Sequence, residues 1–432
     1  MPPTVESFPR PFPSPPLPVF QGVGLALDYA IVDQVSLNVV PIAEQMLAAA
    51  DDVKFAAAAG AAYAWRDGLA LHLLELRHRT PVPTLQGVAT GLAGEIAAIN
   101  KILQQNDALL LPGGMHPWMD PSCETRLRQD AHGHVYHHVE RLFDCTRHGW
   151  TNLHGVRLYL PFANDAEFAR LHAAIRVVLP LIPALTAGSP FAAGIDSGCA
   201  DHRLAVWGDH ATRLAVVSGD IIAPTLSSHE EYDSTILAPA RAAMAPLDPL
   251  GLLRQELICA RGAIACFDHH AIGITLADTQ ECPRADVAVA GAITAVVRML
   301  YTESTSSLES QQAIDTSTLA MVLQRCVRSA EQAELSGDVG AAYLALFGYP
   351  RLACSAQHLW RYLIRSLPRE PGIDDAAMAA LDHILEHGTL ATRLRRATHG
   401  DASPARLHTL YRRLADCLAQ NRMFGGQRST LT

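Results

Sequence analysis

The sequence predicts an α+β fold, because segments typical of strands are concentrated before residue 280 and segments typical of helices follow it. Strand-like runs cover residues 22–33, 69–77, 108–112, 153–160 and 269–279. From residue 283 onwards, apolar residues recur almost entirely at helical spacing. No internal repeat or break in composition marks a second domain. The 432 residues, 49% of them hydrophobic, are enough for one large core.

Residues 22–33 predict the first strand, because apolar residues at odd positions alternate with Ala26, Asp28 and Ala30 on the opposite face. A short helix over residues 40–49 and the strand over 69–77 follow. A helix over residues 87–105 then leads into the strand over 108–112, which ends at a Gly-Gly-Met-His-Pro turn.

The stretch 150–203 predicts a strand, a helix and a polar loop. Asn164 or Asp165 caps the helix, since a side-chain oxygen there accepts a hydrogen bond from the first turn. Pro180 and Pro183 kink or end it. The loop that follows ends at Arg203, and polar groups after a strand–helix unit are a reasonable ligand site. We expect loop or short strands at 204–207 and 214–221, and a helix at 248–259.

The C-terminal third predicts helices, the first of which begins at Pro283, where a missing N–H costs nothing. The apolar run 287–300 is too short to cross a bilayer and contains Arg298, so it predicts a buried helix. The expected helices cover residues 284–302, 309–334, 339–346, 355–366, 374–387 and 404–421.

The composition excludes several classes of partner. The formal charge is −9 and no basic block occurs, which argues against nucleic acid and membranes. Nine cysteines are scattered without a C-x-x-C pair, so we expect reduced thiols and a cytoplasmic protein. Residues 1–20 are proline-rich without an apolar stretch, which predicts a disordered lead-in and no signal peptide.

Generic catalytic motifs are absent from the sequence, including the Walker A loop, G-x-G-x-x-G, G-x-S-x-G and H-E-x-x-H. Residues 132–138 are rich in histidine, and His134 with His138 could bind a metal if helical. A solvated face is the preferred interpretation, because no third ligand lies at a supporting spacing.

Five blocks of the sequence resemble the type 2 glutamate–cysteine ligase family, the bacterial carboxylate–amine ligases. The most specific wording is Gly-Met-His-Pro-Trp-Met-Asp-Pro at 114–121, Ala-Leu-Thr-Ala-Gly-Ser-Pro-Phe at 184–191 and Asp-Thr-Gln-Glu-Cys-Pro at 278–283. The resemblance implies a glutamine-synthetase-like fold, in which a curved antiparallel sheet forms a funnel with helices outside it. It assigns residues 21–300 to the ligase-like domain, with 301–432 packed on it as a helical part.

The resemblance also implies a chemistry, in which ATP phosphorylates a carboxylate and an amine then attacks the acyl phosphate. Such a site needs Mg²⁺, carboxylate oxygens and a cation over the phosphoryl group. The candidate residues divide by role into metal ligands, nucleotide-binding residues and catalytic residues. They are, in that order, Asp28, Glu75 and Asp67; Asn152 and His72; and Arg203, Arg157 and His116.

Several positions depart from the family pattern while the apolar frame around them survives. An acidic residue is expected where the sequence has Ala26, and the expected Asn-Glu reads Asp67-Gly68. Arg157 stands at a histidine position, and Gly273 and Thr275 replace a Glu-x-Arg pair. Ala193 and Ala205 also stand at acidic positions.

Three hypotheses remain open on these residues. The first is a non-catalytic or impaired member that acts as a partner of an active paralogue or binds an amino-acid-like small molecule, with no cofactor. The second is a working Mg-ATP-dependent ligase in which Asp28, Glu75 and Asp67 hold metal and Arg157 and Arg203 hold phosphate or carboxylate. The third is a scaffold without a ligand. The family also makes a homo-oligomer an expected partner state.

Overall fold

The computed structural model describes residues 16–54, 62–128, 133–207, 219–248, 261–366 and 374–425. Its centre is an antiparallel sheet of seven strands in the order β2-β3-β1-β5-β9-β8, with β4 paired to the far end of β1. This arrangement confirms the predicted α+β class. The strands are β1 (Gly24–Asp33), β2 (Tyr63–Asp67), β3 (Leu73–His78), β4 (Ala108–Leu111), β5 (Gly155–Pro161), β8 (Ala263–Cys266) and β9 (Ala271–Asp278).

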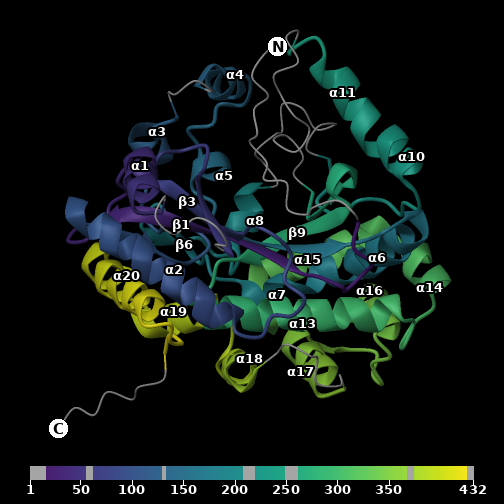
Figure 1. Ribbon diagram of the computed structural model, residues 1–432. Helices are drawn as coiled ribbons and strands as arrows, with labels where there is room; N and C mark the ends of the chain where they lie inside the picture. Colours follow the sequence, from purple (N-terminus) through teal and green to yellow (C-terminus); the bar gives the residue numbers. More distant parts are fainter. Residues whose placement is uncertain are drawn as a thin grey trace.

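Three helices cover one face of this sheet: α2 (Val88–Leu103), α6 (Asp165–Val178) and α13 (Pro283–Tyr301) (Figure 1). The odd-numbered apolar residues of β1 pack against them in the main core, as the alternation predicts. The predicted cap of α6 is confirmed, because Asn164 accepts a hydrogen bond from the Glu167 N–H at 3.0 Å. Helix α13 begins at the predicted proline and is buried along most of its length. Within the described chain, no helix has the length and hydropathy to span a membrane.

Most of the C-terminal helices continue the same core, whereas the last two, Leu390–Thr398 and Pro404–Ala419, pack in a second cluster that includes Ala30 and Val32 of β1. Trp360 donates its indole N–H to the Leu181 carbonyl at 2.9 Å, and the Tyr343 hydroxyl donates to the Val177 carbonyl at 2.8 Å. This layer consists of α14 (Leu308–Ala313), α15 (Thr316–Ser329), α16 (Gly337–Leu346), α17 (Ala356–Ser366), α18 (Asp375–His387), α19 (Leu390–Thr398) and α20 (Pro404–Ala419), with a hairpin of β10 (Glu334–Leu335) and β11 (Cys354–Ser355).

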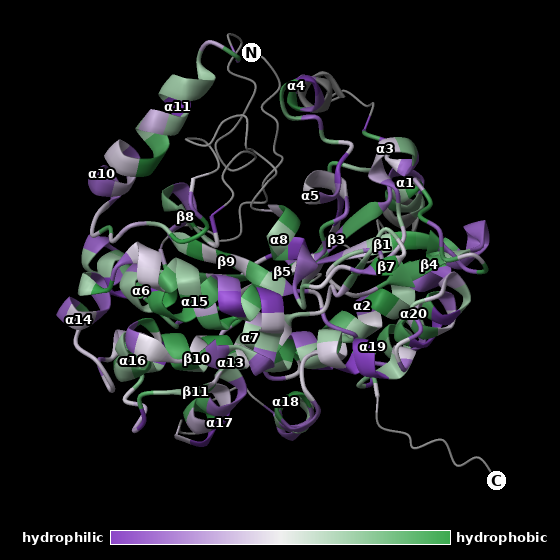
Figure 2. Ribbon diagram, turned by 180° about the vertical axis from the view of Figure 1, so that it is seen from behind, coloured by the Kyte–Doolittle hydropathy of each residue, from purple (hydrophilic) through white to green (hydrophobic). Residues whose placement is uncertain are grey.

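The remaining elements are short, and several of them lie on the other face of the sheet, whereas Pro183–Thr186 packs in the main core. Figure 2 shows α4, α5, α8, α10 and α11 on the side away from α13 and α18. A π-helical turn at Asp233–Leu237 joins α10 to α11. The short elements are α1 (Ala43–Lys54), α3 (Pro121–Glu124), α4 (Gly133–Phe143), α5 (His148–Thr151), α7 (Pro183–Thr186), α8 (His202–Trp207), α10 (His229–Tyr232), α11 (Ala238–Met244), β6 (Phe191–Ala192) and β7 (Ile195–Asp196).

Some expectations about local structure were wrong. Residues 204–207, expected as loop or strand, belong to α8, which is too short to show a helical period. The expected helix 309–334 is broken at Ile314 and Asp315, and strand β2 and helix α19 were not predicted. Residues 16–20, which belong to the expected lead-in, are among the described residues, and Val19 and Phe20 pack on the core. The expected elements at 214–221 and 248–259 lie mostly outside the described residues.

Breaking the buried ion pair between Glu281 and Arg393 should destabilise the fold strongly. Arg393 Nη1 contacts Glu281 Oε1 at 2.5 Å, their side chains are 2% and 0% exposed, and both bond the backbone of Phe424. We expect Arg393→Met to lower the free energy of unfolding by about 3–5 kcal/mol, because an uncompensated carboxylate stays buried. Urea denaturation measures this change. The double variant Glu281→Met/Arg393→Met should recover part of the loss, and equal stability of all three proteins would contradict the prediction.

Candidate functional site

The face of the sheet opposite α13 carries a group of charged side chains, which we call the polar face. It is defined by Asp28 on β1, Arg66 on β2, Glu75 and Arg77 on β3, and Arg157 on β5. Strand alternation places these residues on one side, while their apolar neighbours enter the core on the other. The register brings Asp28 opposite Glu75 and Glu75 opposite Arg66.

Arg157 joins the two carboxylates of the polar face. Its Nη2 donates to Asp28 Oδ1 at 2.9 Å and also contacts Glu75 Oε2. The three side chains are 14–24% exposed. Burial raises the pKa of Asp28, and Arg157 opposes this shift. Burial disfavours the Arg157 cation, but Asp28 and Glu75 outweigh it and hold the pKa of Arg157 above its ordinary value.

Two further arginines, Arg66 and Arg77, lie on the polar face among the described residues. Arg77 is buried, with its Nη1 3.9 Å from Glu75 Oε1 and no partner for its Nε in the described part of the chain. Burial lowers the pKa of Arg77 to about 10, and the charges of Arg66 and Arg157 add to the effect. Three arginines therefore face two carboxylates, an arrangement suited to an anionic ligand.

The third predicted metal ligand, Asp67, lies apart from the other two. Its carboxylate pairs with Arg128 at 2.9 Å at the end of β2. Across the ranges that the structure describes, no three His, Cys, Asp or Glu side chains are grouped so that they could hold a metal ion. The structure thus brings Asp28 and Glu75 together and leaves Asp67 elsewhere.

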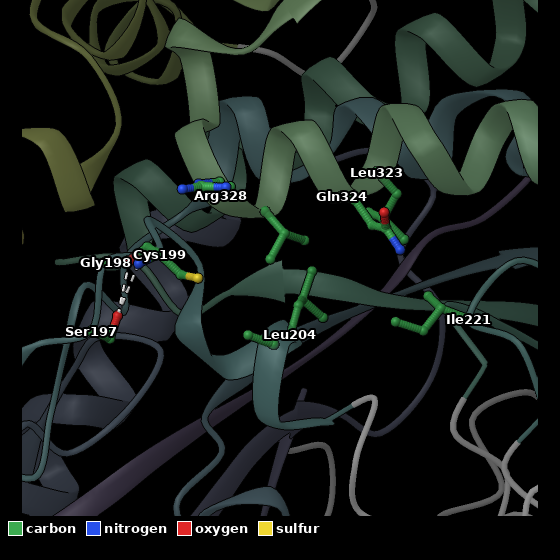
Figure 3. Close-up of a pocket in the computed structure, with 10 residues that line it drawn as sticks. Ser197, Gly198, Cys199, Leu204, Ile221, Leu323, Gln324 and Arg328 are labelled. Carbon is green, nitrogen blue, oxygen red and sulfur yellow. Dashed lines mark hydrogen bonds between the residues drawn. The ribbon is translucent and has the colours of Figure 1, made fainter. Parts of the chain in front are cut away.

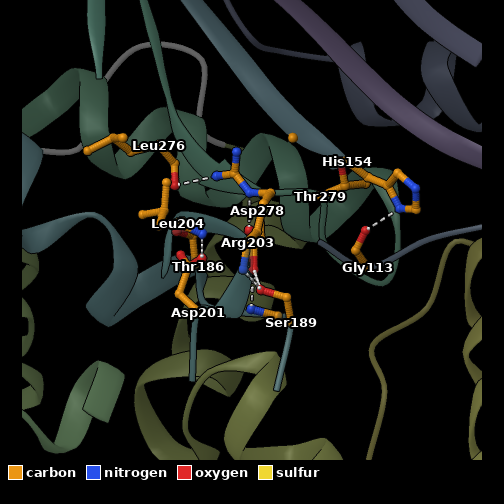
Figure 4. A network of polar contacts seen from close by, with 12 residues as sticks. Gly113, His154, Thr186, Ser189, Asp201, Arg203, Leu204, Leu276, Asp278 and Thr279 are labelled. Carbon is orange, nitrogen blue, oxygen red and sulfur yellow. Dashed lines mark hydrogen bonds and ion pairs between the residues drawn. The ribbon is translucent and has the colours of Figure 1, made fainter. Parts of the chain in front are cut away.

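The predicted residue Arg203 lies beside the polar face, in a network around Asp278 at the end of β9 (Figure 4). Arg203 Nε contacts Asp278 Oδ1, and its Nη2 donates to the Leu276 carbonyl at 2.7 Å. The other oxygen, Asp278 Oδ2, accepts from the Gly188 N–H at 2.8 Å and from the Ser189 hydroxyl at 2.7 Å. Most N–H donors of Arg203 therefore bond groups of the protein itself, namely the Asp278 carboxylate and backbone carbonyls of β9.

Two glycines permit these close approaches. A Cβ at Gly114 would overlap the Asp278 carboxylate. At Gly155 a Cβ would lie 3.1 Å from Arg203 Nη1, and the Gly155 N–H is 3.5 Å from Asp28 Oδ2. Gly155 is thus the link between the Asp278 network and the polar face.

A second acid, Asp201, is buried near this network. Burial raises its pKa well above the ordinary value, and the neighbouring charge of Asp278 raises it further. Arg203 is the cation nearest to both buried carboxyl groups and opposes the rise in the pKa of Asp201.

The predicted residues His72, His116 and Asn152 hold the loops beside β3. Asn152 Oδ1 accepts from the His116 backbone N–H at 2.7 Å, and its Nδ2 donates to the His116 carbonyl at 3.0 Å. His116 Nε2 bonds the Leu37 carbonyl and His72 Nε2 bonds the Thr151 carbonyl, each at 2.8 Å. Their proposed roles toward a substrate or nucleotide stay predictions.

Sequence reasoning missed Arg77 and Asp278. The alternation of residues 73–78 could have placed Arg77 on the face of Glu75, since both are odd-numbered. Asp278 opens a family-like segment, but the alternation of β9 could not place its side chain, because a bulge in the β5–β9 pairing shifts the end of β9. Of the 132–138 cluster, only His138 has a described side chain, and its Nε2 lies 3.4 Å from Asp248 Oδ1.

Comparison with known proteins gives a family match and a fold match. The family model described as Glutamate-cysteine ligase family 2 (GCS2) matches residues 23–409. An uncharacterized protein of Archaeoglobus fulgidus is 29% identical over 230 residues, which are 52% of this chain and 60% of that protein. The chain thus spans less than two thirds of this relative.

Two solved ligase structures share the fold at low sequence identity. A bifunctional glutathione synthetase from Pasteurella multocida aligns with a TM-score of 0.55 and 11% identity, covering 93% of this chain and 53% of that one. A glutamate–cysteine ligase from Francisella tularensis in complex with AMP aligns with a TM-score of 0.54 and 10% identity, covering 91% and 88%. These likenesses agree with the predicted ligase-like fold.

The buried histidines should make stability depend on pH. Burial lowers the pKa of His72 to about 4 from its ordinary 6.5, so the folded state binds fewer protons than the unfolded state between these values. The stability that neutral His72 contributes to the free energy of unfolding is fully present above pH 6.5. It falls by about 3 kcal/mol as the pH drops to 4. His72→Gln, which keeps a donor for Thr151, should therefore gain this amount relative to wild type over that range.

Urea denaturation of both proteins at several pH values measures this difference. The comparison is needed because buried carboxyls with raised pKa, such as Asp201, shift stability in the opposite sense. A constant difference between wild type and His72→Gln from pH 7.5 to pH 4 would contradict the prediction.

Proposed function

Because this chain belongs to glutamate–cysteine ligase family 2, we propose that its polar face derives from a carboxylate–amine ligase site and now binds an anionic, amino-acid-like ligand, with amide formation impaired or lost. The observation that carries this proposal is the position of Arg157 between Asp28 and Glu75. Each carboxylate has one oxygen bonded to the guanidinium group of Arg157, and that oxygen would otherwise be available to a metal ion.

The fit to magnesium is incomplete. Mg²⁺ in phosphoryl-transfer sites is held by one or two carboxylates together with phosphate oxygens and water. Asp28 and Glu75 could supply two oxygens for one ion only if Arg157 moved away. A cluster of several ions would need acidic residues beyond those two, and the described residues near them supply none.

The fit to an anion is better. Arg77 has a buried Nε without a partner among the described residues, and burial lowers its pKa. An anionic group beside Arg77 would relieve the cost of the buried cation. A carboxylate or phosphate also suits the fork of arginine donors, which binds two oxygens at once.

A second candidate is a working ATP-dependent ligase with a rearranged site. It is favoured by the fact that Asp28 and Glu75 remain adjacent on the sheet. In this case Asp28 and Glu75 would hold Mg²⁺, and Arg157 would turn toward the phosphates. Bound Mg-ATP would supply the phosphoryl group that activates a carboxylate for attack by an amine.

Binding of Mg-ATP separates the two candidates. We expect weak binding without dependence on magnesium, and no release of ADP or phosphate with any pair of amino acids. Isothermal calorimetry and a coupled ADP assay measure this for the chain alone and mixed with an active family member. Micromolar, magnesium-dependent binding together with turnover that Glu75→Gln abolishes would overturn the proposal.

Replacing Arg157 should open the carboxylate pair to a cation. In Arg157→Met, Asp28 and Glu75 lose their shared partner, so we expect affinity for Mn²⁺ to rise at least about tenfold. Titration followed by electron paramagnetic resonance measures free Mn²⁺. Arg157→Lys is the matched control, because it keeps the charge, and it should resemble wild type. Unchanged Mn²⁺ affinity in a folded Arg157→Met protein would contradict the proposed block.

A further inference from the structure

A pocket of about 520 Å³ lies between α8 and α15, separate from the polar face (Figure 3). Leu204 of α8 and Leu323 of α15 form facing walls, and Ile221 closes one end. Cys199 and Arg328 lie toward the other end. The volume is within the range of small-molecule sites, roughly 300–1,000 Å³.

The rim of the pocket is held in place by the rest of the fold. Arg395 donates to both oxygens of Asp196, at 2.6 and 2.8 Å, and to the Cys199 carbonyl at 2.9 Å. The Ala200 N–H donates to the Arg328 carbonyl at 3.1 Å. The pocket is therefore formed before any ligand arrives, which lowers the entropic cost of binding.

The lining has a definite chemical character. Its walls are mostly aliphatic, Ser197 and Gln324 add uncharged polar groups, and Arg328 is its one charged residue among those described. The Arg328 side chain is exposed, and no carboxylate of the described chain pairs with it. A ligand that fits both parts has an apolar body and a single anionic group.

We propose that this pocket binds a small amphipathic carboxylate, with its head group on Arg328 and its apolar chain between α8 and α15. The proposal does not rest on the function of the polar face. It identifies a second ligand site on the molecule.

The position of the pocket gives its occupant a route to the polar face. Arg203 and Leu204 are consecutive in α8 and project about 100° apart around the helix axis. Leu204 lines the pocket, and Arg203 contacts Asp278. Arg203 lies next to Gly155, so a ligand that shifts α8 would also displace Arg203. The pocket is therefore suited to regulating what binds at the polar face.

Octanoate is the probe for this site, with 1-octanol and octylamine as matched controls. Calorimetry on the full chain should give octanoate the highest affinity of the three. Arg328→Gln should weaken octanoate at least about tenfold and leave 1-octanol unchanged, because only the charged contact is lost. Ala205→Phe, which fills the pocket, should abolish binding of both.

The polar face could also attract a carboxylate, so Arg157→Met serves as a second control and should leave octanoate affinity unchanged. Arg328 is exposed, so its substitution should not impair folding, which circular dichroism verifies. Absence of octanoate binding at millimolar concentration, equal affinity for octanoate and 1-octanol, or loss of binding in Arg157→Met but not in Arg328→Gln would each overturn the proposal.

Discussion

The contact of Arg157 with Asp28 and Glu75 constrains what the polar face can bind. Two carboxylates side by side on a sheet repel each other and attract a cation, and here the cation belongs to the chain itself. The register gives a structural reason for its presence. Ala26 lies directly opposite Arg157 on one neighbouring strand and opposite Arg77 on the other, so its small side chain leaves room for both guanidinium groups. Ala26 and Arg157, which both differ from the family pattern, are therefore sterically compatible neighbours.

A different carboxylate, Asp278, holds the framework behind the polar face. The three segments with the most family-like wording contribute Gly114, Gly188 with Ser189, and Asp278, and these residues meet around one carboxylate. The contacts are between backbone, a hydroxyl and a buried acid, and they do not require a substrate. The segments that identify the family therefore hold the end of β9 in place, whereas the charged side chains of the polar face lie on β1, β2, β3 and β5.

The sequence predicts the features that depend on local pattern, and it does not predict those that depend on contacts between distant segments. Local alternation placed Asp28 opposite the apolar face of β1, and proline and asparagine correctly marked the starts of α13 and α6. The residue pattern alone could not place Glu75 next to Asp28, because strand register depends on contacts across the sheet. The family resemblance grouped Asp28, Glu75 and Asp67 as metal ligands, and the structure pairs the first two and places Asp67 beside Arg128. The mutual bonds of Asn152 and His116 are equally a product of tertiary structure.

The charges on the polar face limit what family membership implies about activity. A ligase site of this kind attracts metal ions with clustered acids and then binds phosphates through the metals. Among the described residues of the polar face, three arginines accompany two carboxylates, and the proposed preference for an anion over a cation follows from this balance. The fold is compatible with either sign of charge on the polar face, because the main core lies on the opposite face and contains none of these charged residues. Membership in the family therefore fixes the scaffold, whereas the proposed loss of amide formation depends on whether Arg157 stays between the two carboxylates.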